Sequence, residues 1–219
     1  MSKSDSPRIG VLAIQGDYAA HAAALAEAGA DPVEVRNPEQ LDSLDGLILP
    51  GGESTTILKF LERTNPERAN LARPNLPQPA PPAPTFFDRL RDFAAHKPVF
   101  GTCAGCILLA RHVTHPAQKS LGLLDATVER NAYGRQIDSS ILTVPSSLPG
   151  DPLEMVFIRA PRITHTGPEV EVLARRDESP VLVRQGKLMA ATFHPELSSD
   201  RRVHRLFVET VRGVARSKQ

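Results

Sequence analysis

The chain is poor in cysteine and carries almost no net charge. Among its 219 residues there are only two cysteines, Cys103 and Cys106. We therefore do not expect a disulfide framework, and the reducing cytoplasm is the expected compartment. The formal net charge is +1, from 26 basic and 25 acidic residues. With so little charge imbalance, neither a nucleic acid nor an anionic membrane surface is an expected partner.

The sequence also lacks a long apolar run. No stretch approaches the ~18 apolar residues of a membrane-spanning helix, and residues 1–8 lack the apolar centre of a secretory signal peptide. Hydrophobic residues still make up 41% of the chain, which is ordinary for a globular protein. We expect a single domain over residues 1–219 with a substantial core.

The first half of the chain alternates between short apolar runs and helical patterns. Asp17 stands where it can cap the first helix, and Gly29 stands where that helix would stop. Such alternation predicts a mostly parallel sheet with helices on both faces, the α/β class. Strands are expected at 9–14, 32–36 and 44–49, and helices at 17–28, 55–63 and 86–95.

Two regions depart from this alternation. Residues 65–85 are rich in proline, which lacks the N–H that a helix interior or central strand needs, so we expect an extended, flexible insertion there. The second half contains short β-branched or alternating runs, which predict further strands, some antiparallel, before a closing helix. These strands are expected at 126–129, 140–144, 155–159, 171–174, 181–184 and 188–193, and the helix at 201–216.

The segment Gly101-Thr102-Cys103-Ala104-Gly105 links an apolar strand pattern to a run of helix formers. The two glycines permit the strained backbone and close packing of a sharp strand-to-helix elbow. A thiol at a helix start is favoured as the thiolate, which is the nucleophilic form. The segment therefore predicts a cysteine nucleophile at Cys103.

A thiol nucleophile needs a base and a group that orients the base. His194 and Glu196 follow the apolar run at 188–193 and are separated by Pro195. In an extended chain they would point to the same face, and the carboxylate would stabilise the imidazolium. We therefore expect His194 as the general base and acid, with Glu196 as its orienting partner.

An acyl-transfer site also needs donors for an oxyanion. Gly51 and Gly52 follow the expected strand at 44–49, at the edge of a parallel sheet where ligands bind. The backbone N–H groups of Gly52 and Ala104 are the expected donors, the latter because it directly follows the nucleophile. A phosphate-binding loop is disfavoured because its lysine is missing.

The spacing Cys103-Ala104-Gly105-Cys106 leaves a rival interpretation open, a dithiol redox site. The flanking glycines and the His-x-Glu strand, which a redox pair does not require, argue against it. We expect Cys106 to pack in the core. A metal site is not expected, because His112 and His115 lack a second pair of cysteine ligands.

Three segments together resemble the class I glutamine amidotransferases. They are Gly-Thr-Cys-Ala-Gly at 101–105, Pro-Gly-Gly-Glu-Ser-Thr-Thr at 50–56 and Phe-His-Pro-Glu-Leu at 193–197. The resemblance covers nearly the whole chain except the proline-rich insertion and the ends. It is narrowed to the glutaminase subunits of pyridoxal-phosphate synthases by Pro-Gly-Gly-Glu-Ser at 50–54, Glu-Arg-Asn at 129–131 and Ile-Arg-Ala-Pro at 158–161.

The resemblance implies hydrolysis of L-glutamine through a thioester on Cys103, with no metal or organic cofactor. It also implies a hetero-oligomer in which a (β/α)8-barrel synthase subunit receives the ammonia and makes pyridoxal 5'-phosphate. Two alternatives stay open beside the redox protein, namely an amidotransferase that feeds another acceptor and a non-catalytic scaffold. The residues that the resemblance assigns to glutamine binding are Gly52, Glu53, Ser54, Arg130, Ile158 and Arg159.

Overall fold

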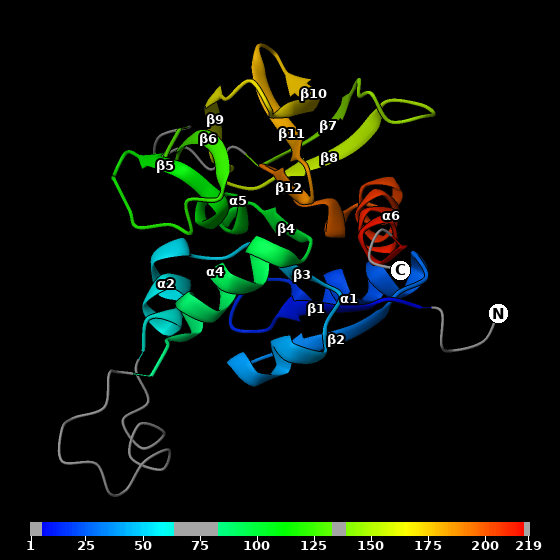
Figure 1. The fold of residues 1–219 in the computed structure, drawn as a ribbon. Coiled ribbons are helices and arrows are strands. Elements are labelled where there is room, and N and C mark those ends of the chain that lie inside the picture. Colours follow the sequence, from blue (N-terminus) through cyan, green and yellow to red (C-terminus); the bar gives the residue numbers. More distant parts are fainter. Residues whose placement is uncertain (1–5, 64–82, 133–138, 217–219) are drawn as a thin grey trace, which may run out of the picture.

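The computed structural model describes residues 6–63, 83–132 and 139–216 and is built around a seven-stranded sheet (Figure 1). The expected proline-rich insertion at 65–85 lies almost entirely outside the described residues. In spatial order the strands of the sheet are β10 (Glu171–Arg176), β11 (Ser179–Gln185), β12 (Leu188–Ala191), β4 (Val99–Thr102), β3 (Gly46–Leu49), β1 (Arg8–Leu12) and β2 (Asp31–Val35).

Five neighbouring strands of this sheet, from β12 to β2, run parallel, and β10 and β11 extend it as antiparallel strands. The central strands β3, β4 and β12 are fully buried and almost wholly apolar, as strands covered on both faces are. The α/β class with additional antiparallel strands is therefore confirmed.

Two small sheets flank the main one. The first contains β5 (Ala110–Thr114), β6 (Leu124–Glu129) and β9 (Arg162–Thr166), and the second contains β7 (Ser140–Val144) and β8 (Leu153–Phe157). The sequence patterns did not predict β5 and β9. Both have at least two exposed or half-buried polar positions in a row, so neither shows the apolar alternation that marks a strand.

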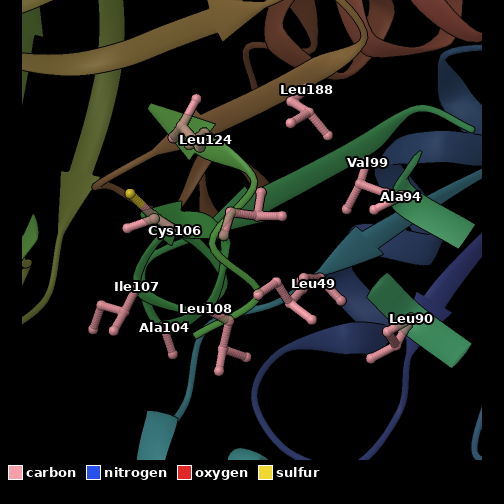
Figure 2. Packing of buried hydrophobic residues seen from close by; sticks show 14 of the residues in the cluster. Leu49, Leu90, Ala94, Val99, Ala104, Cys106, Ile107, Leu108, Leu124 and Leu188 are labelled. Atoms are coloured by element: carbon pink, nitrogen blue, oxygen red, sulfur yellow. The ribbon is translucent and has the colours of Figure 1, made fainter. Parts of the chain in front are cut away.

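Helices cover both faces of the main sheet, and α1 and α6 lie side by side on one of them (Figure 1). Leu47 and Leu49 pack against α2, α4 and α5 on one face, while Ile48 packs toward α1 and α6 on the other. Figure 2 shows part of the first layer, where Leu90 and Ala94 of α4 approach Val99 and Leu49. The helices are α1 (Tyr18–Glu27), α2 (Ser54–Leu61), α4 (Phe86–His96), α5 (Ala104–Leu109) and α6 (Arg202–Arg216), with 3-10 turns η2 (Pro38–Ser43) and η3 (Pro195–Leu197).

Two local expectations differ from the structure. Asp17 occupies the N-cap position of α1, but its side chain makes no capping hydrogen bond. The strand expected to reach Arg159 ends at Phe157, and Arg159 takes a positive φ of 44° in the bend that follows. The helix after Cys103 is a single short element that ends at Leu109 and turns into β5. None of the helices in the described ranges is both long and apolar enough to cross a bilayer.

Candidate active site

The carboxyl ends of four parallel strands meet at one edge of the main sheet. Strand β4 lies between β3 and β12, with Leu49 opposite Gly101 and Ala191 opposite Thr102. The residues that follow these strands therefore emerge side by side, although they are far apart in sequence. This edge is where open α/β sheets bind their ligands.

Cys103 sits on a strained elbow between β4 and α5. Its backbone angles, φ of 48° and ψ of −103°, lie in a region that residues other than glycine rarely adopt. Its backbone N–H donates to the carbonyl of Ala191 at 2.9 Å, which ties the elbow to β12. A Cβ at Gly101 would lie 2.4 Å from the Gly105 carbonyl oxygen, and one at Gly105 would lie 1.9 Å from that of Leu49. The elbow therefore needs both glycines, as the sequence predicts.

His194 and Glu196 form a buried pair after β12. Nδ1 of His194 lies 2.7 Å from Oε1 of Glu196, and the two side chains are 9% and 0% exposed. The expected extended geometry is wrong, because residues 195–197 form a 3-10 turn led by Pro195. The expected contact still forms, since the turn folds Glu196 back onto the imidazole.

The environment of His194 favours its charged form. Burial lowers the pKa of the imidazole, but hydrogen bonds to Cys103 and Glu196, together with their charges, raise it to about 10. Because Glu196 occupies Nδ1, Nε2 is the nitrogen that remains for the thiol. The arrangement therefore favours a charged imidazolium beside the Cys103 thiol.

The loop after β3 brings its glycines to the same place. A Cβ on Gly51 would lie 2.6 Å from Cε1 of His194, and one on Gly52 would lie 3.2 Å from Oε1 of Gln15. Oε1 of Gln15 also accepts from the N–H of Glu53 at 3.0 Å. The side chain of Gln15, in the loop that follows β1, thus supports the loop that follows β3.

A cavity of about 690 Å³ opens at this edge and brings together most of the expected site residues. Ala104, the second expected oxyanion donor, is buried at the first position of α5 and does not line the cavity. The expected residues that do line it are Cys103, His194, Gly52, Glu53, Ser54, Arg130, Ile158 and Arg159.

Glu53 and Arg130 form one wall of the cavity. The Glu53 carboxylate accepts from the backbone N–H groups of Thr55 and Thr56 at 3.0 and 2.7 Å, and so caps α2. Desolvation raises the pKa of Glu53, but the hydrogen bonds from Thr56 and Thr55 outweigh it and lower the pKa to about 2. Nη2 of Arg130 lies 3.3 Å from Glu53 and donates to Oγ1 of Thr55 at 2.8 Å. This wall therefore presents a fixed cation beside a fixed anion.

Cys106 lies apart from this chemistry. It is fully buried in the apolar layer around α5, as Figure 2 shows, and burial raises the pKa of its thiol to about 12. The expectation that Cys106 packs in the core is confirmed.

Sequence reasoning missed two polar side chains near His194 and Glu196. Asp17, expected as a helix cap, lines the cavity, and its carboxylate lies within 4.8 Å of His194 and Glu196. Its position between β1 and α1, on the loop at the carboxyl end of a parallel strand, is the signal that could have found it, and the same rule located Gly51 and Gly52. The other is His21, a fully buried polar residue in the alanine-rich helix α1. Asp17, His194 and Glu196 could together hold a metal ion, but His194 and Glu196 already satisfy each other.

Comparisons with known proteins agree with this geometry. The model of the SNO glutamine amidotransferase family matches residues 11–78 and 83–213. Pyridoxal 5'-phosphate synthase subunit PdxT of Koribacter versatilis is 56% identical over 206 residues, which cover 94% of this chain and 96% of that protein. The protein of the same name from Solibacter usitatus is 50% identical over 208 residues, covering 92% of this chain and 97% of its own.

A solved structure described as a glutamine amidotransferase is similar throughout. It shares 43% sequence identity with a TM-score of 0.75 and covers 93% of this chain and 98% of its own. The family model, the two relatives and the solved structure each match nearly the whole length of this chain, including the segments that form the cavity. The chain therefore belongs to the SNO glutamine amidotransferase family.

Proposed function

We propose that this chain is a cytoplasmic glutaminase that supplies ammonia to pyridoxal 5'-phosphate synthase. The observation that carries the proposal is that Cys103 and His194 line one cavity with Arg130, while Glu196 is buried behind His194 and pairs with its Nδ1. The relatives named as PdxT subunits of that synthase support the choice of acceptor. A reduced thiol nucleophile fits a reducing compartment, and both cysteines are free in the structure.

In the first half-reaction the Cys103 thiolate attacks the side-chain amide carbon of glutamine. The carbonyl electron pair moves to oxygen, and the backbone N–H groups of Gly52 and Ala104 are the proposed donors to that oxyanion. His194 gives its proton to the departing nitrogen, so the C–N bond breaks and ammonia leaves. Cys103 is then bound to the glutamyl group as a thioester.

In the second half-reaction water releases glutamate. His194, neutral after the first step, takes a proton from water as the water attacks the thioester carbon. The C–S bond breaks, and Cys103 leaves as the thiolate beside the newly formed imidazolium. Throughout, Glu196 holds Nδ1 of His194, so that Nε2 carries out both transfers.

The charges around the cavity suit a free amino acid. Arg130 and Arg159 are the proposed partners of the α-carboxylate, since a guanidinium binds a carboxylate with two parallel hydrogen bonds. Glu53, ionised at neutral pH, is the proposed partner of the α-ammonium together with neighbouring backbone carbonyls. Ser54 and Ile158 complete the proposed glutamine site.

The proposed acceptor of ammonia is a (β/α)8-barrel synthase subunit in a hetero-oligomer with this chain. Free ammonia would be lost to water, so coupling to a docked partner makes the hydrolysis useful. The dithiol redox interpretation is disfavoured, because Cys106 is fully buried with a pKa near 12 and cannot readily act as a second thiolate.

The test is glutamate release from glutamine by the purified chain, with and without the synthase subunit. We expect turnover to rise when the subunit is added and to vanish in Cys103→Ala. Pyridoxal 5'-phosphate formation is expected with glutamine for the wild-type complex, and only with added ammonium salt for the Cys103→Ala complex. Turnover that persists in Cys103→Ala would overturn the proposed nucleophile. Glutamine turnover without glutamine-dependent pyridoxal 5'-phosphate formation would instead favour another acceptor.

A further inference from the structure

A chain of buried histidines lies directly behind the proposed triad. His21 of α1 and His204 of α6 are both fully buried, and Nδ1 of His21 lies 3.1 Å from Nε2 of His204. On its other side, Nε2 of His21 lies 3.2 Å from Oε2 of Glu196 and 3.1 Å from Oγ1 of Thr102. His21 therefore touches both the triad carboxylate and the residue that precedes Cys103.

The contact with Glu196 reaches the carboxylate oxygen that His194 leaves unused. Oε1 of Glu196 faces His194, whereas Oε2 is buried and makes no hydrogen bond among the described residues, so that Nε2 of His21, at 3.2 Å, is the donor that lies close to it. A buried carboxylate oxygen without a donor is costly, so the N–H of His21 decides whether Glu196 is held in place.

The surroundings select one tautomer of His21. Burial, the main cause, lowers the pKa of His21 well below its ordinary value, with His204 and His194 adding to the effect. Burial likewise lowers the pKa of His204 to about 4. Both rings are thus neutral, and each carries one hydrogen.

With its hydrogen on Nε2, His21 donates to Oγ1 of Thr102, keeps this N–H within 3.2 Å of Oε2 of Glu196, and accepts on Nδ1 from His204. The other tautomer would turn the Nε2 lone pair toward the carboxylate and leave an N–H on the unpartnered Nδ1 of His204. A buried N–H without an acceptor is rarer than a buried unpaired acceptor. Both considerations place the hydrogen on Nε2.

We propose that His21 is a positioning residue of the active site, which holds the Glu196 carboxylate against Nδ1 of His194 while His204 holds His21 in the required tautomer. Only the expected effect of His21 on kcat rests on the proposed glutaminase function. The other charged groups that face this chain of side chains are Asp17, near His194 and Glu196, and the Arg201–Glu27 pair, near His204.

Glutamine and asparagine at position 21 separate a positioning role from a merely structural one. A glutamine amide nitrogen is three bonds from Cβ, as Nε2 of histidine is, whereas an asparagine amide nitrogen matches Nδ1. His21→Gln therefore keeps a donor toward Glu196, and His21→Asn loses it. His21→Leu removes both polar contacts, and Leu25→Ala on the same helix is a control that disturbs buried packing alone.

The readout is the rate at which iodoacetamide alkylates Cys103, followed by mass spectrometry across pH. The alkylation rate reports the thiolate–imidazolium pair whether or not the chain hydrolyses glutamine. The result of this test therefore does not depend on whether the proposed function is correct. When Glu196 loses the His21 donor, its carboxylate turns to regain one and supports the imidazolium less well. The half-maximal rate should then move up by about one pH unit in His21→Asn and His21→Leu. His21→Gln and Leu25→Ala should stay at the wild-type pH.

In the glutaminase assay, His21→Leu should lower kcat about tenfold, as expected for one lost hydrogen bond to a charged group, with KM unchanged. Equal alkylation profiles for His21→Gln and His21→Asn would overturn the proposal, as would an equal shift in Leu25→Ala. If His21→Leu does not fold, the Gln and Asn pair decides alone. His204→Gln and His204→Asn test the role of His204 in the same way. Equal alkylation profiles for these two variants would remove His204 from the proposal.

Discussion

Gly51 lies directly against the imidazole ring of His194. A Cβ at this position would be 2.6 Å from Cε1 and 3.3 Å from Nδ1 of His194, and 3.6 Å from Cβ of Cys103. The ring cannot move away freely, because Nδ1 is hydrogen-bonded to Glu196 at 2.7 Å. The position of the His194 ring beside Cys103 therefore depends on the absence of a side chain at Gly51.

Gly51→Ala should consequently lower kcat by about 100-fold, the typical cost of displacing a catalytic group by about 1 Å. Glutamate release in the presence of the synthase subunit measures the effect. Gly213→Ala in α6 is the matched control, since a Cβ there would meet no atom within 4 Å. Alanine in a helix interior should stabilise that variant by about 0.5–1 kcal/mol and leave turnover unchanged. A Gly51→Ala enzyme with wild-type turnover would contradict the role given to this contact.

The raised pKa of His194 predicts a broad pH range of activity. The value of about 10 in the folded protein lies above the ordinary 6.5. The contribution of the imidazolium to folding stability is therefore complete below pH 6.5 and is lost as pH rises through about 10. We expect kcat/KM to fall on the alkaline side near this upper value, because the proton that leaves with ammonia is then missing.

Glu196→Gln should shift that alkaline limb to lower pH, since an amide carries no charge to hold the imidazolium. Its kcat should also fall by about 10²–10⁴, the usual contribution of general acid–base catalysis. Profiles of kcat/KM from pH 5 to about 10.5 would check both effects. An unchanged alkaline limb in Glu196→Gln would show that Glu196 does not set the proton affinity of His194.

The parallel sheet and the meeting of Cys103 and His194 at one of its edges could be predicted from sequence because each depends on local signals. The Gly-x-Cys-x-Gly elbow specifies its own backbone, and the apolar runs before Gly51, Cys103 and His194 predict strands whose ends meet at one edge. Pro195 misled the local prediction, since it starts a 3-10 turn where an extended link was expected. The His194–Glu196 contact survived because the turn also brings positions i and i+2 together.

The histidines behind the triad could not be predicted in this way. His21 lies 183 residues from His204 and 81 residues from Thr102 in the chain, so no local pattern links them. Their contacts arise only when α1 and α6 pack on the same face of the sheet. Likewise, strands β5 and β9 depend on pairing with β6 rather than on their own composition.

Arg130 should act on substrate binding more than on chemistry. Its side chain is 14% exposed, is held by Thr55 and Glu53, and lines the cavity. Arg130→Lys keeps the charge but loses the two-pronged geometry that suits a carboxylate. We expect KM for glutamine to rise about tenfold, the cost of one charge-assisted hydrogen bond, with kcat little changed.

Arg162→Lys is the matched control for Arg130. Arg162 pairs with Glu129, the neighbour of Arg130, but does not line the cavity. Steady-state kinetics of both variants should therefore show a raised KM only for Arg130→Lys. The same KM increase in both would point to a general disturbance of β6 and not to substrate binding by Arg130.

Cys106 provides the test that separates hydrolysis from redox chemistry. Its thiol is fully buried with a pKa near 12, so it should neither attack a disulfide nor assist Cys103. Cys106→Ala should keep glutamine turnover within about twofold and lose about 1 kcal/mol of stability through the void in the apolar layer. Cys103→Ala should show the opposite pattern, with lost turnover and near wild-type thermal unfolding. If Cys106→Ala folds but loses turnover, the second thiol takes part in the chemistry and the hydrolytic scheme is incomplete.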